Sequence, residues 1–273
     1  MKGSVFVTGV AGFLGRRVAQ DLLEDGYRVM GCDDFSVSSP KNVPPEVLFR
    51  EGKCEDLKFN DLLTADAVVH CAAIARSAWP RPQEIWTANV RGTQNVMHAA
   101  RSAAIDNIVY ASSSVVHHPD SSVYARTKSV AERLSLGAGA TCLRFGNIYG
   151  PGQNELGYEP NVIASMRRSV RDNGVVRVDG TGEQTRDFVH VSDASNAVLS
   201  AIDEPLPAMW LDICTGVQTS IRTVAEAFNS PIVWGDSRND PPAIIQDPKP
   251  AEILLHWTPS VSIEEGLKQV AFV

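Results

Sequence analysis

Short apolar runs alternate with longer amphipathic segments up to about residue 145 of this 273-residue chain. The apolar runs predict strands and the amphipathic segments predict helices. Because parallel strands need crossover connections, which are usually helices, the alternation predicts an α/β fold with a doubly wound parallel sheet. Strands are predicted at Ser4–Thr8, Tyr27–Cys32, Val47–Arg50, Ala67–Cys71, Asn107–Ser112 and Thr141–Phe145.

The alternation loosens after Gly150-Pro151-Gly152, a sequence that interrupts both helices and strands. Beyond it, the pattern predicts a helix over Asn161–Arg171, a hairpin over Val175–His190 and a proline-rich tail. We therefore expect a main sheet domain over residues 1–150 and a smaller C-terminal lobe over most of residues 151–273.

One segment of the smaller lobe is expected to return to the main sheet. Ser192–Ile202 has the pattern of a helix, and Met209–Ile213 has that of a strand. Residues 187–213 are therefore predicted to rejoin the sheet as one more helix and strand.

Composition argues against several classes of protein. The chain is 44% hydrophobic and 21% charged, which is typical of a globular protein, and its net charge of −7 gives no reason to expect nucleic-acid binding. No stretch approaches the ~20 apolar residues of a membrane span, and no secretion leader precedes the first strand. We therefore expect a cytoplasmic protein with no membrane partner. The five cysteines are far apart and form no C-x-x-C pair, so no disulfide framework or metal site is predicted.

A glycine-rich turn follows the first strand directly. The residues Gly9-Val10-Ala11-Gly12-Phe13-Leu14-Gly15 lead into a helix pattern, Arg16–Glu24. Such glycines allow a tight turn and a close backbone approach to a pyrophosphate, which the helix N-terminus then binds. The turn predicts a Rossmann-type fold, with Gly9, Gly12, Phe13, Leu14 and Gly15 at a dinucleotide cofactor.

Two aspartates end the second strand. Asp33 and Asp34 follow the turn by about 20 residues, where a carboxylate accepts hydrogen bonds from the adenosine ribose. Their presence favours NAD over NADP. For Asp34, a solvated loop position is the alternative.

A tyrosine and a lysine stand four residues apart, at Tyr124 and Lys128, within the helix pattern Tyr124–Leu136. This spacing places both side chains on one helix face. An ammonium beside the phenol, with a cationic nicotinamide nearby, would lower a pKa that is ordinarily about 10 and make Tyr124 a general base. A surface pair is the alternative interpretation.

Three serines, Ser112-Ser113-Ser114, lie at the carboxyl end of the fifth strand, the edge where doubly wound sheets bind ligands. A serine hydroxyl there is able to polarise the substrate oxygen that Tyr124 deprotonates. The alternative is that the serines only cap the strand or the following turn.

Taken in order, these motifs and two later segments, Leu143–Pro151 and Gly182–Val191, resemble the NAD-dependent epimerase/dehydratase family of extended short-chain dehydrogenases/reductases, and the UDP-sugar 4-epimerases in particular. The resemblance covers nearly the whole chain. It implies an NAD-binding first domain and a lobe that binds a nucleotide-diphosphate sugar.

The resemblance also assigns catalytic roles. Tyr124 would be the acid/base, Lys128 its partner and a ligand of the nicotinamide ribose, and Ser113 the hydroxyl donor. Ser113 is chosen by register, because His117 stands where the family has the tyrosine of V-Y-G; Ser112 or Ser114 would replace it if the strand shifted by one residue.

Further binding residues come from the same resemblance. At the cofactor it implies Cys71, Ala72, Ala73 and Asn89. It also implies Cys54 in the adenine pocket, although the sequence there differs from that of relatives. At the nucleotide diphosphate it implies Asn147, Asn161, Arg186 and Arg238. Family members are usually homodimers through two helices, for which Asn89–Arg101 and Tyr124–Leu136 are the candidates.

The reaction is inferred by elimination within the family. Dehydratases and decarboxylases resemble one another in having acidic residues just after the catalytic serine or threonine, where this chain has Ser114 and Val115. NADPH-dependent reductases would lack Asp33. Epimerisation through a transient 4-keto sugar is therefore predicted, and a dehydratase, a reductase or a non-catalytic NAD-binding protein is the alternative.

Two features bear on the identity of the sugar. The segment from Ser113 to Tyr124 is shorter than is usual in the family, which argues against assuming the galactose substrate. The resemblance also implies that Ile244 replaces a bulky tyrosine of the glucose/galactose epimerases, which suggests room for an acetamido group.

Overall fold

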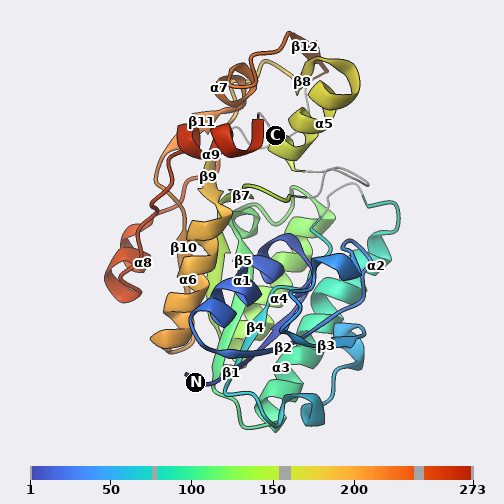
Figure 1. The fold of residues 1–273 in the computed structure, drawn as a ribbon, viewed down its shortest axis with the longest axis vertical. Helices are drawn as coiled ribbons and strands as arrows, with labels where there is room; N and C mark the ends of the chain where they lie inside the picture. The colour runs from blue at the N-terminus through green and yellow to red at the C-terminus, as the bar shows by residue number, and fades with distance from the viewer. Residues whose placement is uncertain (1, 76–78, 154–160, 237–242, 272–273) are drawn as a thin grey trace.

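The computed structural model describes residues 2–75, 79–153, 161–236 and 243–271. Its centre is a seven-stranded parallel sheet in the order β10-β6-β5-β4-β1-β2-β3 (Figure 1). The strands are β1 (Ser4–Thr8), β2 (Arg28–Asp33), β3 (Leu48–Glu51), β4 (Ala67–His70), β5 (Asn107–Ser113), β6 (Thr141–Phe145) and β10 (Met209–Ile213). The predicted doubly wound α/β sheet is confirmed. Its strand order reverses between β1 and β4, which is where such sheets bind ligands.

Helices cover both faces of the sheet (Figure 1). On one face lie α1 (Phe13–Glu24) and α6 (Val191–Asp203), and on the other lie α3 (Gly92–Ser102) and α4 (Val123–Gly137). A short helix α2 (Pro82–Trp86) and a π-helical turn (Thr87–Arg91) lead into α3. Single 3₁₀ turns span Pro40–Asn42, Cys54–Asp56, Phe59–Leu62 and Ser114–His117.

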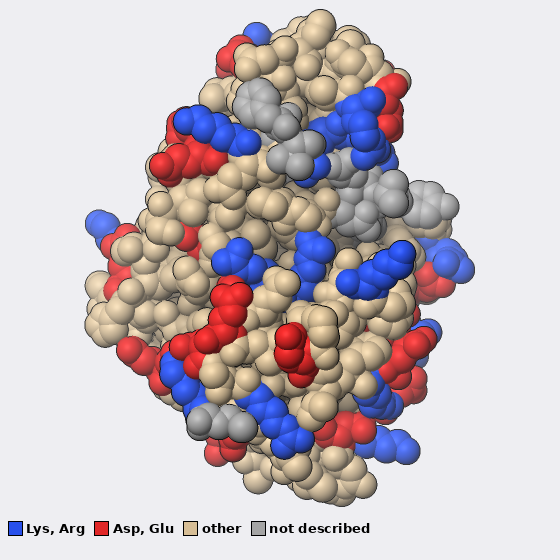
Figure 2. Space-filling view, in the orientation of Figure 1, with Lys and Arg blue, Asp and Glu red and all other residues tan. Residues whose placement is uncertain are grey.

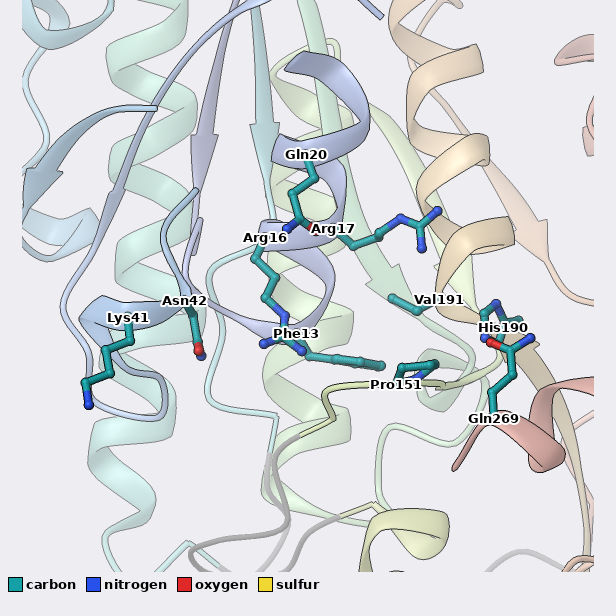
Figure 3. Close-up of a pocket in the computed structure, with 10 residues that line it drawn as sticks. All are labelled: Phe13, Arg16, Arg17, Gln20, Lys41, Asn42, Pro151, His190, Val191 and Gln269. Carbon is teal, nitrogen blue, oxygen red and sulfur yellow. The ribbon is translucent and has the colours of Figure 1, made fainter. Parts of the chain in front are cut away.

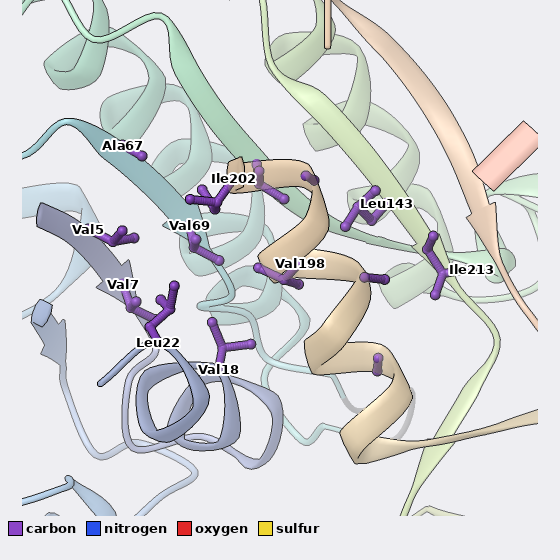
Figure 4. Close-up of a cluster of buried hydrophobic side chains, with 14 of the residues drawn as sticks. Val5, Val7, Val18, Leu22, Ala67, Val69, Leu143, Val198, Ile202 and Ile213 are labelled. Carbon is purple, nitrogen blue, oxygen red and sulfur yellow. The ribbon is translucent and has the colours of Figure 1, made fainter. Parts of the chain in front are cut away.

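Successive side chains of each strand point to opposite faces of the sheet, so the main domain has one hydrophobic core on each face. In β1, Val5 and Val7 face α1 and α6, where they pack with Leu22 and Val198 (Figure 4), whereas Phe6 faces α3. All of these side chains are buried. Because side chains alternate between the faces of a strand, a fully buried strand with a continuous apolar run is what a sheet covered on both sides requires.

The smaller lobe has its own core and two small sheets. It contains β7 (Asn147–Tyr149), α5 (Val162–Asn173), β8 (Val176–Asp179), β9 (Thr185–His190), β11 (Gln218–Ser220), α7 (Ile221–Glu226), β12 (Ile232–Gly235) and α9 (Ile263–Ala271), and α8 (Lys249–Leu254) lies beside β10. No helix in the described ranges has both the length and the apolar character needed to cross a membrane.

The predicted hairpin over Val175–His190 is wrong. β8 pairs with β12, and β9 pairs with β7 and β11, so the two strands do not pair with each other. Between them, Gly180 and Gly182 have φ of +75° and +76° and turn the chain out of the plane of β8. β9 then continues into α6, and β10 pairs with β6 at the edge of the main sheet, so Met209–Ile213 lies in that sheet.

Candidate active site

The glycine-rich turn between β1 and α1 is closely packed. Gly9 has φ of +68°, and a Cβ atom there would lie 2.7 Å from Ala72 Cα; a Cβ atom at Gly15 would lie 2.1 Å from the carbonyl oxygen of Gly9. Both positions therefore require glycine. Gly12 caps α1 without a side-chain hydrogen bond, so no side chain at this position satisfies the first N–H groups of the helix. Phe13 and Leu14, in that first turn, are both half-buried.

Asp33 lies against this turn. Its carboxylate is 8% exposed and accepts hydrogen bonds from Ala11 N at 3.0 Å, Phe35 N at 2.9 Å and Ser38 Oγ at 2.7 Å. Asp34 is exposed and accepts a hydrogen bond from Ser36 N at 3.0 Å. The structure thus brings Asp33 to the glycine turn and leaves Asp34 at the surface.

The loop after β4 is tied to the helix that carries Tyr124. Asn89 is 1% exposed; its Oδ1 accepts from Ile74 N at 2.8 Å, and its Nδ2 donates to Ile74 O at 3.2 Å and to Thr127 Oγ1 at 3.1 Å. The hydroxyl of Thr127 donates to Tyr124 O at 2.8 Å. Thr127 was missed by sequence reasoning, although it stands inside the Tyr124–Lys128 motif.

The four other residues predicted on the cofactor side lie in two different surroundings. Cys71 and its neighbours Ala72 and Ala73 are half-buried beside Gly9, and burial raises the pKa of the Cys71 thiol to about 12, so the thiol is neutral. Cys54 is buried in the core between β2 and α3, where a hydrogen bond to Cys32 and burial raise its pKa.

Ser113, Tyr124 and Lys128 meet at the carboxyl end of β5. Ser113 is the last residue of β5, and Tyr124 lies in the first turn of α4, which Ser122 caps by accepting from Ala125 N at 3.0 Å. Ser113 lies beside the phenol of Tyr124, where its hydroxyl lowers the pKa of that phenol. Lys128 is 3% exposed, and its Nζ donates to Ala111 O at 2.5 Å and lies 4.2 Å from the centroid of the Tyr110 ring.

The neighbouring serines have other surroundings. Ser112 donates to Glu132 Oε2 at 2.6 Å, in a buried network in which Glu132 also pairs with Arg144 at 2.7 Å. Ser114 is 4% exposed and begins the turn that follows. Ser113 is therefore the serine whose side chain lies beside Tyr124.

The predicted lowering of the Tyr124 pKa is not found in the protein alone. Burial raises the pKa of Tyr124 to about 12, and the hydrogen bond with Ser113 offsets part of that rise. Lys128 does not offset this rise, and its ammonium is directed at Ala111 O and the Tyr110 ring. Burial also lowers the pKa of Lys128 to about 8.

Three of the four residues predicted at the diphosphate lie in or beside the sheet β11-β9-β7. Asn147 is in β7, Arg186 is in β9, and Asn161 precedes α5 and donates from Nδ2 to Ile148 O at 3.0 Å. Arg186 Nη1 donates to Thr185 O at 2.7 Å. Arg238 lies outside the described residues. Ile244 is 7% exposed, and its carbonyl accepts from Gln218 Nε2 at 3.1 Å, so it borders the same sheet.

The parallel sheet has a glycine-rich turn where its strand order reverses. A serine, a tyrosine and a lysine meet at the carboxyl end of β5. Together these features define a Rossmann-type protein of the extended short-chain dehydrogenase/reductase type. Residues 5–208 match the model of the NAD dependent epimerase/dehydratase family. The chain belongs to this family. The predicted family is confirmed, and the predicted NAD cofactor is confirmed at the level of the family.

Similar proteins cover the chain from end to end. It is 30% identical to a putative UDP-glucose 4-epimerase of Methanocaldococcus jannaschii over 97% of this chain and 96% of that protein. The UDP-glucose 4-epimerase of Thermotoga maritima, solved with UDP-glucose, superposes with a TM-score of 0.90 at 26% identity, covering 98% of this chain and 97% of that one. MoeE5, solved with UDP-glucuronic acid and NAD, gives a TM-score of 0.86 at 30% identity, covering 98% of both chains.

Proposed function

We propose that this protein is an NAD-dependent nucleotide-sugar 4-epimerase that acts on a UDP-sugar. The observation that carries the proposal is that Ser113, Tyr124 and the buried Lys128 meet at the carboxyl end of β5, at the sheet edge next to the glycine turn. The similar proteins named above are epimerases or bind UDP-sugars, which supports the substrate class.

The chain's own residues fit the cofactor. The glycine turn leaves no room for a Cβ atom at two of its positions, the first N–H groups of α1 are uncapped, and Asp33 ends β2 beside them. These groups would hold the pyrophosphate and the adenosine ribose, while Lys128 would bind the nicotinamide ribose. When bound, NAD supplies the two-electron oxidation and reduction of the sugar carbon.

Tyr124 would move the proton of the sugar hydroxyl at C4. As phenolate it takes this proton while C4 is oxidised to a ketone, and it returns the proton when the ketone is reduced from the opposite face. Ser113 would donate a hydrogen bond to the same oxygen. Because burial raises the pKa of Tyr124 to about 12, a cationic group brought close to the phenol is needed to populate the phenolate near neutral pH.

Arg186, Asn147 and Asn161 are proposed to hold the diphosphate of the substrate, because a guanidinium pairs with phosphate oxygens through two hydrogen bonds. They share a position in or beside the sheet β11-β9-β7 of the smaller lobe, which supports this proposal. Arg238 remains a predicted second arginine at this diphosphate.

The first experiment is product analysis without added cofactor. Purified protein is incubated with UDP-, GDP- and dTDP-sugars, and the products are separated by chromatography with mass detection. A new peak of unchanged mass is expected. A product lighter by water or carbon dioxide would identify a dehydratase or decarboxylase, and no product even with added NAD would favour a non-catalytic NAD-binding protein.

We further propose a homodimer formed through α3 and α4, which pack side by side on one face of the sheet (Figure 1). Light scattering after size-exclusion chromatography is expected to give twice the chain mass, and a monomer would contradict the proposal. The cytoplasmic location stays a prediction.

A further inference from the structure

A row of uncharged polar groups lies in the interior of the main domain. Figure 2 shows charged side chains of both signs over one face of the molecule, whereas Thr8, His70 and Thr93 are each at most 1% exposed. Thr8 ends β1 and His70 ends β4, and the two are paired neighbours where the strand order reverses. Thr93 lies in the first turn of α3. The row therefore begins at the sheet edge that carries the candidate active site.

Five groups are hydrogen-bonded in sequence along this polar row. Ala72 N donates to Thr8 Oγ1 at 3.3 Å, and Thr8 Oγ1 lies 2.6 Å from His70 Nδ1. His70 Nε2 lies 2.8 Å from Thr93 Oγ1, whose hydroxyl donates to Asn89 O at 2.6 Å. The polar row thus has a backbone N–H at one end and a backbone carbonyl at the other.

The two backbone ends determine the direction of every hydrogen bond between them. A backbone N–H can only donate, and a carbonyl can only accept. Because Thr93 gives its one hydroxyl hydrogen to Asn89 O, it accepts from His70 Nε2, which therefore carries a hydrogen. His70 Nδ1 is then the acceptor for the hydroxyl of Thr8. The ring of His70 is the neutral Nε2–H tautomer.

The surroundings of His70 keep its ring neutral. Burial lowers the pKa of His70 to about 3, and the charge of Lys128 acts in the same direction. The ring of Tyr110 lies beside both groups, with its centroid 5.5 Å from that of His70 and 4.2 Å from Lys128 Nζ. A protonated ring would donate at both nitrogens, and the hydroxyl of Thr8 would lose its acceptor. The single direction of the polar row therefore depends on a neutral histidine.

The two ends of the polar row belong to two parts of the candidate site. Ala72 packs against Gly9, and the helix that follows this glycine turn lines a cavity of about 360 Å³ with Phe13 (Figure 3). At the other end, the side chain of Asn89 donates to Thr127 of α4. The polar row therefore connects the glycine turn with the residue that supports the catalytic helix.

We propose that His70, as the neutral Nε2–H tautomer, is a positioning residue for the bound cofactor. It couples the loop at Ala72 to Asn89, so the hydroxyl of Thr93 supports NAD binding from the far side of the ring. This inference rests on NAD binding by the proposed enzyme and does not depend on the sugar or on the reaction.

The tautomer is tested by nitrogen NMR on the full chain labelled with 15N-histidine. The His70 signal is the one that changes both in Thr8→Val and in Thr93→Val. A neutral ring with its hydrogen on Nε2, unchanged from pH 5.5 to pH 8.5, is expected. The proposal would be overturned by a hydrogen on Nδ1, by the lack of a signal that responds to both variants, or by a ring that gains a proton near pH 6.5, about where an unperturbed histidine titrates.

The coupling is tested by the rate at which bound NAD exchanges for added NADH, followed by NADH fluorescence. Thr8→Val and Thr93→Val each remove a hydroxyl and keep the shape of the side chain. Each is expected to speed NAD release about fivefold, the effect of one hydrogen bond. The double variant should release NAD no faster than the faster single variant, because a break at either end uncouples the polar row. A rise to about 25-fold, the product of two independent effects, would overturn the proposal.

Thr141→Val is the matched control. Thr141 is 3% exposed, and its hydroxyl donates to Leu206 O at 3.3 Å at the start of β6, two strands away from β4. The control should lose stability in urea, as Thr93→Val does, and keep the wild-type rate of NAD release. Equal acceleration by the control would show general loosening and overturn the proposal. A wild type that holds no NAD would instead contradict the proposed function, and the tautomer, which is measured without cofactor or substrate, would still decide this inference.

Discussion

The side-chain amide of Asn89 donates a hydrogen bond of 3.1 Å to the hydroxyl of Thr127, which connects the loop after β4 to the helix that carries Tyr124 and Lys128. The same amide group satisfies both backbone groups of Ile74. One buried residue therefore positions the loop at the glycine turn and the first turn of α4 relative to each other.

We expect Asn89→Ala to lower both stability and turnover. It leaves the N–H and the carbonyl of Ile74 without their side-chain partner and removes the bond to Thr127, and each buried unsatisfied group costs about 1–3 kcal/mol. Urea denaturation is expected to show a loss of about 3 kcal/mol or more. The matched control is Asn95→Ala on α3, because Asn95 donates to the carbonyls of Cys54 and Leu57 away from Tyr124. The control should lose stability and keep its kcat, and equal kcat values for the two variants would contradict a positioning role for Asn89.

Tyr124→Phe is expected to reduce turnover by about 10²–10⁴-fold, the range that general acid–base catalysis contributes. NAD content, measured by absorbance after denaturation, should be unchanged. Tyr27→Phe is the control, because its hydroxyl bonds to Asp203 at the opposite edge of the sheet. Full activity in Tyr124→Phe would contradict the proposed acid/base role of Tyr124.

The pKa of Lys128 predicts a pH dependence of stability. Burial lowers this pKa from 10.5 to about 8, so between those values the unfolded chain binds more protons than the folded one. The contribution of Lys128 to stability therefore rises with pH over this window, by about 2 kcal/mol from pH 8 to pH 10. Below pH 8, both states carry the proton and the contribution is constant.

Urea denaturation of the wild type and of Lys128→Met at pH 7, 8, 9 and 10 measures this effect. The difference between their unfolding free energies should stay flat up to pH 8 and then change in favour of the wild type. Parallel curves over the whole range would contradict the lowered pKa.

Most strands of the main sheet were predictable from the sequence to within one residue, because an apolar run between helix patterns determines a strand by itself. The pairing of Val176–Asp179 with Ile232–Gly235 was not, since their separation in sequence carries no local signal and a glycine-rich turn between two strands resembles a hairpin. The pKa of Tyr124 in the protein alone was not predictable for a related reason. The sequence places Lys128 one turn away, but the direction of its ammonium depends on Ala111 and Tyr110 from another element.

Gly9→Ala is expected to abolish NAD retention. The added Cβ would lie 2.7 Å from Ala72 Cα, and φ at this position is +68°, so the turn must move. Gly137→Ala at the end of α4 is the control: no atom lies within 4 Å of its added Cβ, and alanine favours the helix. Cofactor content is read by absorbance after denaturation, and NAD binding by Gly9→Ala equal to the control would contradict the proposed cradle.

The identity of the sugar is tested at Ile244. We propose that Ile244 limits the space for the sugar; the residue is 7% exposed beside the sheet that carries Arg186. We expect wild-type protein to turn over UDP-GlcNAc faster than UDP-glucose. Because a larger ring would fill the space for the acetamido group, Ile244→Tyr should lower kcat/KM for UDP-GlcNAc by about tenfold or more and leave UDP-glucose nearly unchanged. Ile245→Tyr, at the neighbouring residue, which is 71% exposed, is the matched control and should change neither value. If the wild type turned over UDP-GlcNAc no faster than UDP-glucose, the acetamido hypothesis would be wrong. The 4-epimerase proposal would not be affected, because product analysis and the Tyr124→Phe variant test it separately.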